Sequence, residues 1–472
     1  MRLLVTLTLF LSPFPHAHAQ RAEYLSDELL QFVTADAPVI AVSNVRVVVG
    51  DGTPADDEQT ILIRDGRIEK IGSHLSLPSD TKVIDGQGMT ALPGLVMLHE
   101  HLFYSSSKGQ VGNYGDLQPI AFPRLYLAHG VTMLRTAGSF EPVNELQIKR
   151  GIAEGRFIGP EMDITAPYLE GPGSFLHQAE PIETPEEARR IVAFWAEQGA
   201  TSFKAYNFIS RENLAAVIEE AHARDLKVTG HLCSVTFSEA ADLGIDNLEH
   251  GLNSATDFVD GKKPDQCKFH DAAVFMAGLD VESPAVQALI EKLVVEKVAI
   301  TSTLAVLADL GTRTTRPTAE ALASLSEEAR TRYLQMKGYV SSATNDEALK
   351  VEMAFQRAFV AAGGLLVAGT DPTGIGGAIA GFGSLWQIEL LVEAGFTPLE
   401  AIKIGTYNGA QYLELLEELG TLAPGKRADI MLVRGRPDEE ITDIRNVEIV
   451  FKNGIGYAAR ALIDSVKGLV GR

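Results

Sequence analysis

The stretch Pro93-Gly94-Leu95-Val96-Met97-Leu98-His99-Glu100-His101 is the most informative part of this chain. It predicts an apolar strand that ends in two histidines, His99 and His101, spaced two positions apart. In a β-strand such side chains project from the same face, about 7 Å apart along the backbone. Two imidazoles that converge at a strand end can hold one metal ion. The stretch therefore predicts a metal site whose remaining ligands must come from other segments.

The size and composition of the chain limit the classes of protein to consider. A chain of 472 residues is the right length for one large barrel and a smaller satellite domain. Its 46% hydrophobic and 22% charged residues are typical of a well-folded globular protein. The net charge of −21 argues against nucleic acid or an anionic membrane surface as the main partner. No apolar run is long enough to span a membrane in the mature protein.

Residues 1–19 have the pattern of a signal peptide. Arg2 supplies the positive start, residues 3–11 are apolar, and Ala17-His18-Ala19 is a small-residue cleavage site before Gln20. We therefore expect an exported protein, periplasmic or secreted, from a bacterium. The two cysteines, Cys233 and Cys267, could form a disulfide in such a compartment, although two buried thiols explain them equally well.

Both ends of the mature chain have β-character. Residues 36–91 alternate short strands with Asp-Gly turns, and residues 420–457 return to turns and strands with Asn453-Gly454 in a hairpin. We expect these two segments to form one composite β-sandwich domain. A C-terminal helix is expected over residues 458–472.

Residues 92–419 alternate short apolar strands with helical stretches such as residues 183–197 and 211–224. Eight strands are expected, at residues 95–99, 131–135, 162–166, 201–205, 227–231, 245–249, 298–303 and 365–370. This alternation predicts an α/β fold, a closed (β/α)8 TIM barrel. Two long insertions, residues 167–181 and 252–275, follow strands three and six and are expected to shape the substrate pocket.

Chemically active residues fall at the carboxyl ends of these strands. His99 and His101 end strand one, His231 ends strand five, and His250 follows strand six. Asp371 follows strand eight, where it could bind metal and act as a base. Strand ends converge on one mouth in such a barrel, so these five side chains predict a metal site.

Lys204, near the end of strand four, can be interpreted in two ways. A lysine in an apolar strand is costly unless it is paired, and Asp163 or Glu170 could be its partner. Alternatively, a desolvated lysine loses its proton easily and reacts with carbon dioxide. The resulting carbamate is an oxygen ligand that can bridge two cations.

Together these motifs resemble the amidohydrolase superfamily, specifically its imidazolonepropionase-like and prolidase-like branch. The resemblance extends from the N-terminal strands through Pro-Gly-Leu-x-x-x-His-x-His to the Pro-Gly-Lys-x-Ala-Asp segment at residues 424–429. It implies two divalent cations, most often zinc, although such ligands also accept manganese or cobalt. The implied ligands are His99, His101 and Asp371 for the first cation, His231 and His250 for the second, and carboxylated Lys204 as the bridge.

The resemblance also implies a reaction. Two cations lower the pKa of a shared water, the hydroxide attacks a carbonyl, and Asp371 passes the proton to the leaving group. Single-metal deaminases of the superfamily typically lack a lysine at the position of Lys204, so this residue favours hydrolysis of an amide, peptide, ester or lactone bond over deamination of a base. Dipeptidases of this branch often carry Gly-Gly-His after strand three, whereas residues 165–173 read TAPYLEGPG.

The substrate and its contacts are less constrained. Tyr206 should point the same way as Lys204 and either touches substrate or packs at the rim. Arg135 could bind a substrate carboxylate or pair with a structural acid, and we prefer the second interpretation. His177 and Glu170 lie in an insertion and could contact substrate, but solvated loop residues are the simpler interpretation. The main hypothesis is an exported binuclear hydrolase acting on a small molecule or short peptide, as a dipeptidase or N-acyl amino acid carboxypeptidase. The alternatives are hydrolysis of a cyclic amide, lactone or carbamate, and a non-catalytic binding barrel; a homo-oligomer is expected only by analogy.

Overall fold

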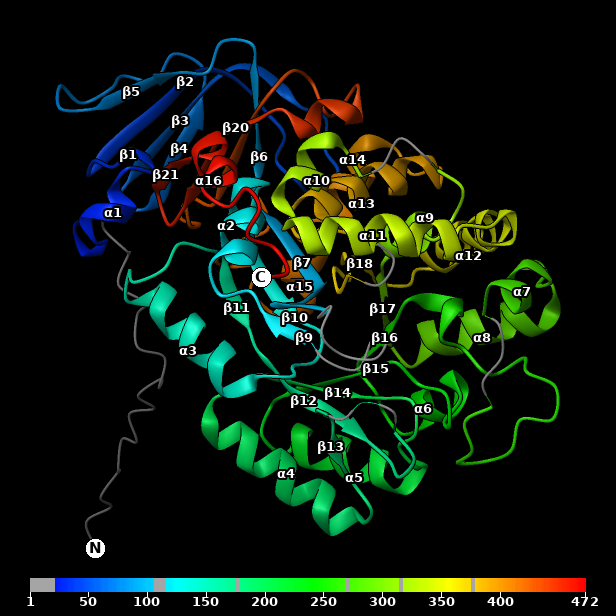
Figure 1. Ribbon diagram of the computed structural model, residues 1–472. Helices are drawn as coiled ribbons and strands as arrows, with labels where there is room; N and C mark the ends of the chain where they lie inside the picture. Colours follow the sequence, from blue (N-terminus) through cyan, green and yellow to red (C-terminus); the bar gives the residue numbers. More distant parts are fainter. Residues whose placement is uncertain are drawn as a thin grey trace, which may run out of the picture.

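Two regions of strands, one mixed and one parallel, organise the chain (Figure 1). The computed structural model describes residues 22–105, 115–174, 176, 178–268, 272–313, 317–374 and 378–472. The predicted signal peptide, residues 1–19, lies outside these ranges. Among the described residues, none of the helices combines the length and apolarity needed to cross a bilayer.

Strands from both ends of the chain share one nine-stranded sheet, drawn in blue and red in Figure 1. Its order is β1-β21-β20-β19-β6-β2-β3-β4, and β5 pairs with β2. Apolar residues of alternate positions, such as Ile40 and Val42 of β2, are fully buried beneath it. The strands are β1 (Val33–Ala35), β2 (Val39–Val47), β3 (Asp56–Arg64), β4 (Arg67–Gly72), β5 (Lys82–Asp85), β6 (Met89–Pro93), β19 (Ile430–Arg434), β20 (Val447–Lys452) and β21 (Ile455–Ala458). These nine strands form a single sheet, so the predicted β-sandwich stays a prediction.

The parallel strands follow the predicted positions closely. One sheet contains β7 (Leu95–Glu100), β10 (Val131–Thr136) and β11 (Glu161–Asp163). The other contains β12 (Thr165–Glu170), β13 (Glu180–Pro181), β14 (Ser202–Ala205), β15 (Lys227–Gly230), β16 (Asn247–Glu249), β17 (Ala299–Ser302) and β18 (Leu366–Ala368). Residues that follow β18 bring the two sheets together, because the backbone N–H groups of Thr370 and Asp371 donate to the carbonyl of His99, at 3.0 and 2.9 Å. This junction places the ends of β7 and β18 side by side.

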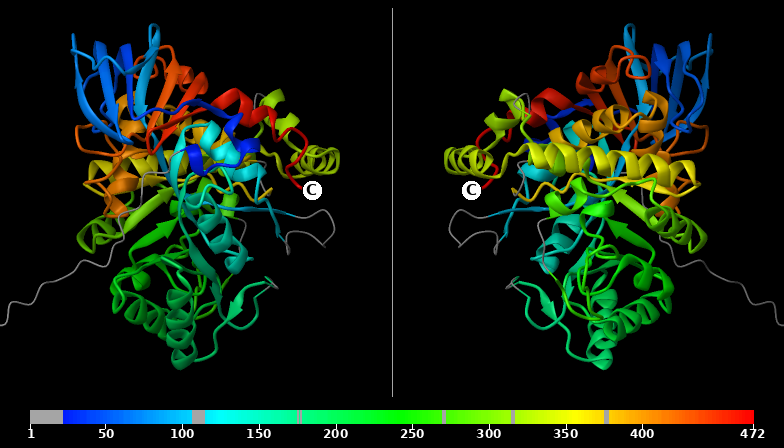
Figure 2. Two further views of the ribbon diagram at one scale, coloured as in Figure 1. Left: turned by 90° about the vertical axis from the view of Figure 1, so that its left-hand side faces the viewer. Right: turned by 90° about the vertical axis from the view of Figure 1, so that its right-hand side faces the viewer.

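Helices follow most of the parallel strands and cover their outer side. The described α-helices are α1 (Asp27–Leu30), α2 (Ala121–Ala128), α3 (Pro142–Ala153), α4 (Pro185–Gln198), α5 (Arg211–His222), α6 (Phe237–Asp242), α7 (Ala272–Ala277), α8 (Pro284–Val295), α9 (Leu304–Asp309), α10 (Ala319–Ser324), α11 (Glu327–Val340), α12 (Ala343–Ala361), α13 (Phe382–Glu393), α14 (Pro398–Ile404), α15 (Tyr407–Tyr412) and α16 (Ala459–Asp464). The side chain of Thr184 caps α4, and Gly199 ends it with a positive φ of 102°. In Figure 2 the nine-stranded sheet and the α4–α5 pair lie at opposite ends of the molecule.

Two predicted segments differ in the structure. The first is the insertion at residues 167–181, because β12 continues to Glu170 and Tyr168 pairs in parallel register with Lys204. Glu170 is therefore buried rather than solvated. The second is the C-terminal helix predicted over 458–472, because α16 ends at Asp464 and turns with glycines of positive φ follow it.

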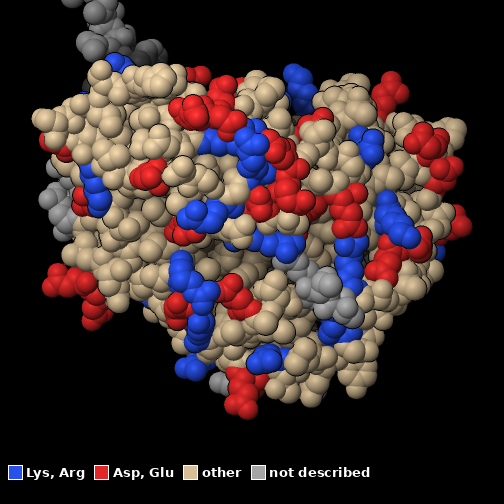
Figure 3. Space-filling model, turned by 90° about the horizontal axis from the view of Figure 1, so that it is seen from above, with Lys and Arg blue, Asp and Glu red and all other residues tan. Residues whose placement is uncertain are grey.

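A disulfide joins Cys233, just after β15, to Cys267 in the insertion that follows β16. The structure thus selects the paired state from the two that the sequence left open. On the face seen in Figure 3, acidic and basic side chains are interspersed, and neither sign forms a continuous patch.

Candidate metal centre

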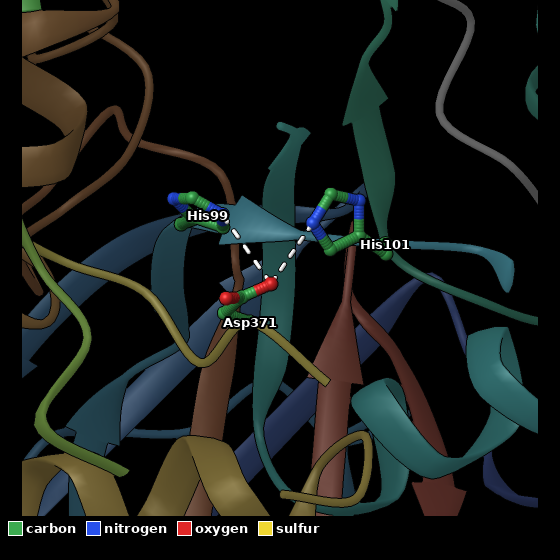
Figure 4. A group of neighbouring side chains, drawn as sticks. All are labelled: His99, His101 and Asp371. Atoms are coloured by element: carbon green, nitrogen blue, oxygen red, sulfur yellow. Dashed lines mark ion pairs between the residues drawn. The ribbon is translucent and has the colours of Figure 1, made fainter. Parts of the chain in front are cut away.

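Three side chains converge at the junction of β7 and β18. His99 in β7 and His101, the first residue after β7, project to the same side because they are two positions apart, and Asp371 lies in the turn after β18 (Figure 4). The Nε2 atoms of His99 and His101 lie 3.5 and 3.1 Å from the Asp371 Oδ1. One ligand atom from each residue lies within 4.8 Å of the others, a separation that suits coordination of one cation. Figure 4 shows the two imidazoles on either side of the carboxylate.

The backbone near Asp371 is shaped for this convergence. Asp371 has a φ of 56°, a left-handed conformation that is uncommon outside glycine. Two residues earlier, a Cβ on Gly369 would lie 2.3 Å from the Cβ of His99. Only glycine allows β18 to approach β7 this closely, which brings the carboxylate within reach of both histidines.

Hydrogen bonds fix how the two imidazoles face. The Nδ1 of His99 donates to the Glu249 carboxylate at 2.6 Å, and the Nδ1 of His101 donates to the Gly138 carbonyl at 3.3 Å. With these tautomers, both Nε2 atoms present lone pairs toward the Asp371 oxygen. Three lone-pair donors that face one another repel unless a cation lies between them, so this donor set fits a divalent metal ion. Burial also favours metal binding, because desolvation lowers the pKa of His101 to about 4 and keeps its ring neutral.

Lys204 lies beside this group. Its Nζ is 3.4 Å from the Nε2 of His99 and faces the rings of Tyr168 and Tyr206, at 5.6 and 5.7 Å from their centroids. Burial lowers the pKa of Lys204 to about 8, so a neutral, nucleophilic amine is accessible near neutral pH.

Neither acid considered as a partner for Lys204 takes that role. Asp163 accepts a hydrogen bond from the hydroxyl of Ser202 at 2.6 Å, and Glu170 accepts one from the backbone N–H of Phe208 at 2.7 Å. The structure therefore leaves Lys204 facing the histidines.

His231 and His250 extend the row of imidazoles. The ring centroid of His250 lies 4.5 Å from that of His99 and 4.8 Å from that of His231. His250 is buried and His231 is partly buried, and desolvation lowers the pKa of His231 to about 3 and that of His250 well below its usual range. Neutral imidazoles are the form that binds metal. A second cation would thus find two nitrogen donors next to Lys204.

Comparison with known proteins agrees with this geometry. The sequence model of the amidohydrolase family matches residues 90–455, most of the chain. The chain belongs to the amidohydrolase family. This confirms the family predicted from the histidine motif, and it supports a metal-dependent hydrolase acting on C–N bonds.

The individual proteins similar to this amidohydrolase match it either over a short segment or at low sequence identity. An imidazolonepropionase from Vibrio cholerae is 42% identical over 57 residues, which cover 12% of this chain and 14% of that protein. A Xaa-Pro dipeptidase with bound methionine is 18% identical with a TM-score of 0.66, covering 89% of this chain and all of the other. Phenylurea hydrolase B is 18% identical with a TM-score of 0.68, covering 92% and 99% of the two chains. At this identity the two structures show the fold alone, a TIM-barrel-type α/β fold.

Of the three predicted substrate residues, one is buried in an ion pair, one is partly exposed beside the site, and one lies outside the described residues. Arg135 is buried beneath the amidohydrolase site, where it donates to the Glu249 carboxylate at 2.7 Å and to the Leu98 carbonyl at 2.8 Å. Arg135 therefore pairs with a structural acid, as we preferred, and does not face the open end of the site. Tyr206 packs on His231 with 4.7 Å between ring centroids and keeps a partly exposed side chain. His177 lies outside the described residues.

Two residues of the site were not predicted from the sequence. Glu249 orients His99 and pairs with Arg135, and its only sequence signal is its place at a strand end before His250. Tyr168 faces Lys204 but belongs to the stretch expected to be a loop. Periodicity across TAPYLE is weak because Pro167 interrupts it, which concealed the strand.

Proposed function

We propose that this amidohydrolase is an exported, binuclear, metal-dependent hydrolase that cleaves an amide or peptide bond, as a dipeptidase or N-acyl amino acid carboxypeptidase. The proposal depends on one observation: His99, His101 and Asp371 converge, and the Nζ of Lys204 lies 3.4 Å from the Nε2 of His99. His99, His101 and Asp371 would hold one cation, His231 and His250 the second, and Lys204 carboxylated by carbon dioxide would bridge them. Zinc suits these nitrogen and oxygen ligands. Bound cations would polarise the scissile carbonyl and lower the pKa of water.

The residues of the chain supply the remaining steps. The Asp371 side chain is 19% exposed, so one carboxylate can reach both the histidines and incoming substrate. We propose that it accepts a proton from the attacking water and delivers it to the leaving nitrogen. The Glu249 carboxylate holds His99 in one tautomer throughout. Tyr206, at the rim beside His231, is the proposed contact to the substrate.

We extend the proposal to the architecture and the compartment. Only Ile164 separates β11 from β12, and the residues after β18 hydrogen-bond to the end of β7, which supports a closed (β/α)8 barrel. The Cys233–Cys267 disulfide supports export, since disulfides persist in oxidising compartments. The signal-like residues 1–19 agree with it.

An activity panel tests this function. Protein beginning at Gln20, loaded with zinc and bicarbonate, is assayed on dipeptides, N-acyl amino acids and lactones. We expect turnover of amide substrates, and a loss of at least 100- to 10,000-fold in kcat for Asp371→Asn, which keeps the volume of the side chain but removes both the proton acceptor and an anionic cation ligand. Turnover of lactones or esters alone by the fully loaded protein would contradict the proposal.

A further inference from the structure

His250 occupies an unusual backbone position. It follows β16 and precedes the 3-10 helix η2 (Gly251–Asn253), with a φ of 65°. A left-handed conformation is uncommon for a residue with a Cβ and persists only where the surroundings impose it. The direction of the His250 ring therefore depends on what holds this turn.

A buried carboxylate from a distant helix holds it. Glu352 of α12 is fully buried, and its Oε2 accepts a hydrogen bond from the backbone N–H of Leu252 at 2.8 Å. The turn lies directly on this side chain, because a Cβ added to Gly251 would come within 1.9 Å of the Glu352 Oε1. The residue after His250 must be glycine for this contact to form.

The ring of His250 has a second support from β17. Its Nδ1 lies 2.7 Å from the Thr303 hydroxyl, and its backbone N–H donates to the Thr301 carbonyl at 3.1 Å. Thr303 directly follows Ser302, the last residue of β17. The strand end and the η2 turn thus grip His250 from two sides.

A relay of buried polar side chains connects the two supports. Gln356 donates to the Glu352 Oε1 at 2.8 Å and accepts from the Ser302 hydroxyl at 2.7 Å. Gln387 of α13 in turn donates to the same hydroxyl at 2.7 Å. All four side chains are fully buried. Burying so many polar groups is costly and adds nothing that apolar packing would not, unless their fixed geometry is used.

We propose that Glu352, acting through Gln356 and Ser302, is the positioning residue that sets His250 as a ligand for the second cation. The inference depends on the binuclear site of the proposed function. Glu352 touches neither cation nor substrate; it fixes the turn from which the His250 imidazole projects. The hydrogen bonds described for the relay side chains do not include His99, His101 or Asp371, so we expect the first cation to bind without this relay.

Cation binding tests the proposal without any substrate. Full-length mature protein is loaded with zinc and bicarbonate, dialysed against a chelator of known affinity, and analysed for zinc by mass spectrometry. We expect two zinc ions per chain in the wild type. Glu352→Ala should keep the first ion and bind the second 10- to 100-fold more weakly, the usual loss when a residue that orients a ligand is removed. Glu352→Gln should retain both ions, because its amide oxygen can still accept from Leu252.

Glu145→Ala is the matched control. Glu145 is a fully buried helix carboxylate on α3 that interacts with Thr136 and Ser139 near the end of β10 rather than with the η2 turn, so its removal should leave the second ion bound. If Glu352→Ala fails to fold, Ser302→Ala removes the middle of the relay with a smaller loss of packing and should also weaken only the second ion. Wild-type affinity for the second ion in Glu352→Ala or Ser302→Ala, or equal weakening in Glu145→Ala, would overturn the proposal. Two bound ions without amide hydrolysis would instead contradict the proposed reaction and leave the positioning role intact.

Discussion

Removing Arg135 should destabilise this amidohydrolase strongly, because the guanidinium is one half of a buried ion pair. Arg135 and Glu249 are each at most 1% exposed, and the Nη2–Oε1 distance is 2.7 Å. The other Glu249 oxygen accepts from His99, so Arg135→Met leaves a buried carboxylate that keeps hydrogen bonds from His99 and the Thr229 hydroxyl but loses its ion-pair partner. Breaking one side of a buried pair costs about 3–5 kcal/mol of the free energy of unfolding.

Urea unfolding of metal-stripped protein measures this loss without a contribution from bound cations. The double variant Arg135→Met/Glu249→Gln removes both charges and is the matched control. It should be about 0.5–3 kcal/mol more stable than the sum of the two single variants predicts, since contacting residues couple by that much.

Arg135→Met should also weaken metal binding, because Arg135 holds the Glu249 carboxylate that orients His99. Loss of the orienting residue itself lowers metal affinity about 10- to 100-fold, which is about 1.4–2.7 kcal/mol, and this is the upper limit for Arg135→Met. A stability within about 0.5 kcal/mol of wild type, with a raised KM for carboxylate-bearing substrates only, would refute the reasoning. It would show that Arg135 faces the substrate, the alternative that its sequence position left open.

Three further outcomes follow from the structure. Lys204→Ala should lose the second cation and most activity, with partial recovery in added propionate; full activity would rule out a bridging role. Burial raises the pKa of Glu170 to about 7, so the folded protein binds this proton more tightly than the unfolded chain and stability falls as pH rises from about 4.5 to 7. In Glu170→Gln the free energy of unfolding, measured by urea titration, should lack this decline of roughly 3 kcal/mol between about pH 4.5 and 7. A pH profile equal to that of the wild type would contradict the raised pKa of Glu170. Replacing Cys233 and Cys267 by serine removes a cross-link between residues 34 positions apart. The gain in chain entropy of the unfolded state should lower the free energy of unfolding by about 4 kcal/mol. An unchanged thermal midpoint would argue against the disulfide.

The centre of the site could be predicted because two simple rules place it. Side chains two apart share a strand face, and the carboxyl ends of parallel strands meet, so His99, His101 and Asp371 had to converge once the strands were recognised. The strands themselves were readable since every residue of β7 and β10 is buried, β7 opens with four apolar residues, and β10 is rich in apolar and β-branched residues.

The supporting residues could not be found this way. Glu249 and Glu352 act through contacts with elements that are distant in sequence, and no local pattern distinguishes them from solvated acids. Glu352 lies in a long helix whose other glutamate, Glu347, is exposed and pairs with Lys350. Only the packing of α12 against the η2 turn shows which of the two carboxylates is buried.

Counting the cations bound per chain distinguishes a binuclear centre from a mononuclear or empty one. Mature protein is loaded with zinc and bicarbonate, desalted, and analysed for metal alongside His101→Ala and Asp371→Asn. We expect two zinc ions per chain in the wild type and clear loss of zinc in both variants. Less than one equivalent in the loaded wild type, or the same content in all three proteins, would contradict a binuclear centre at the ends of β7 and β18.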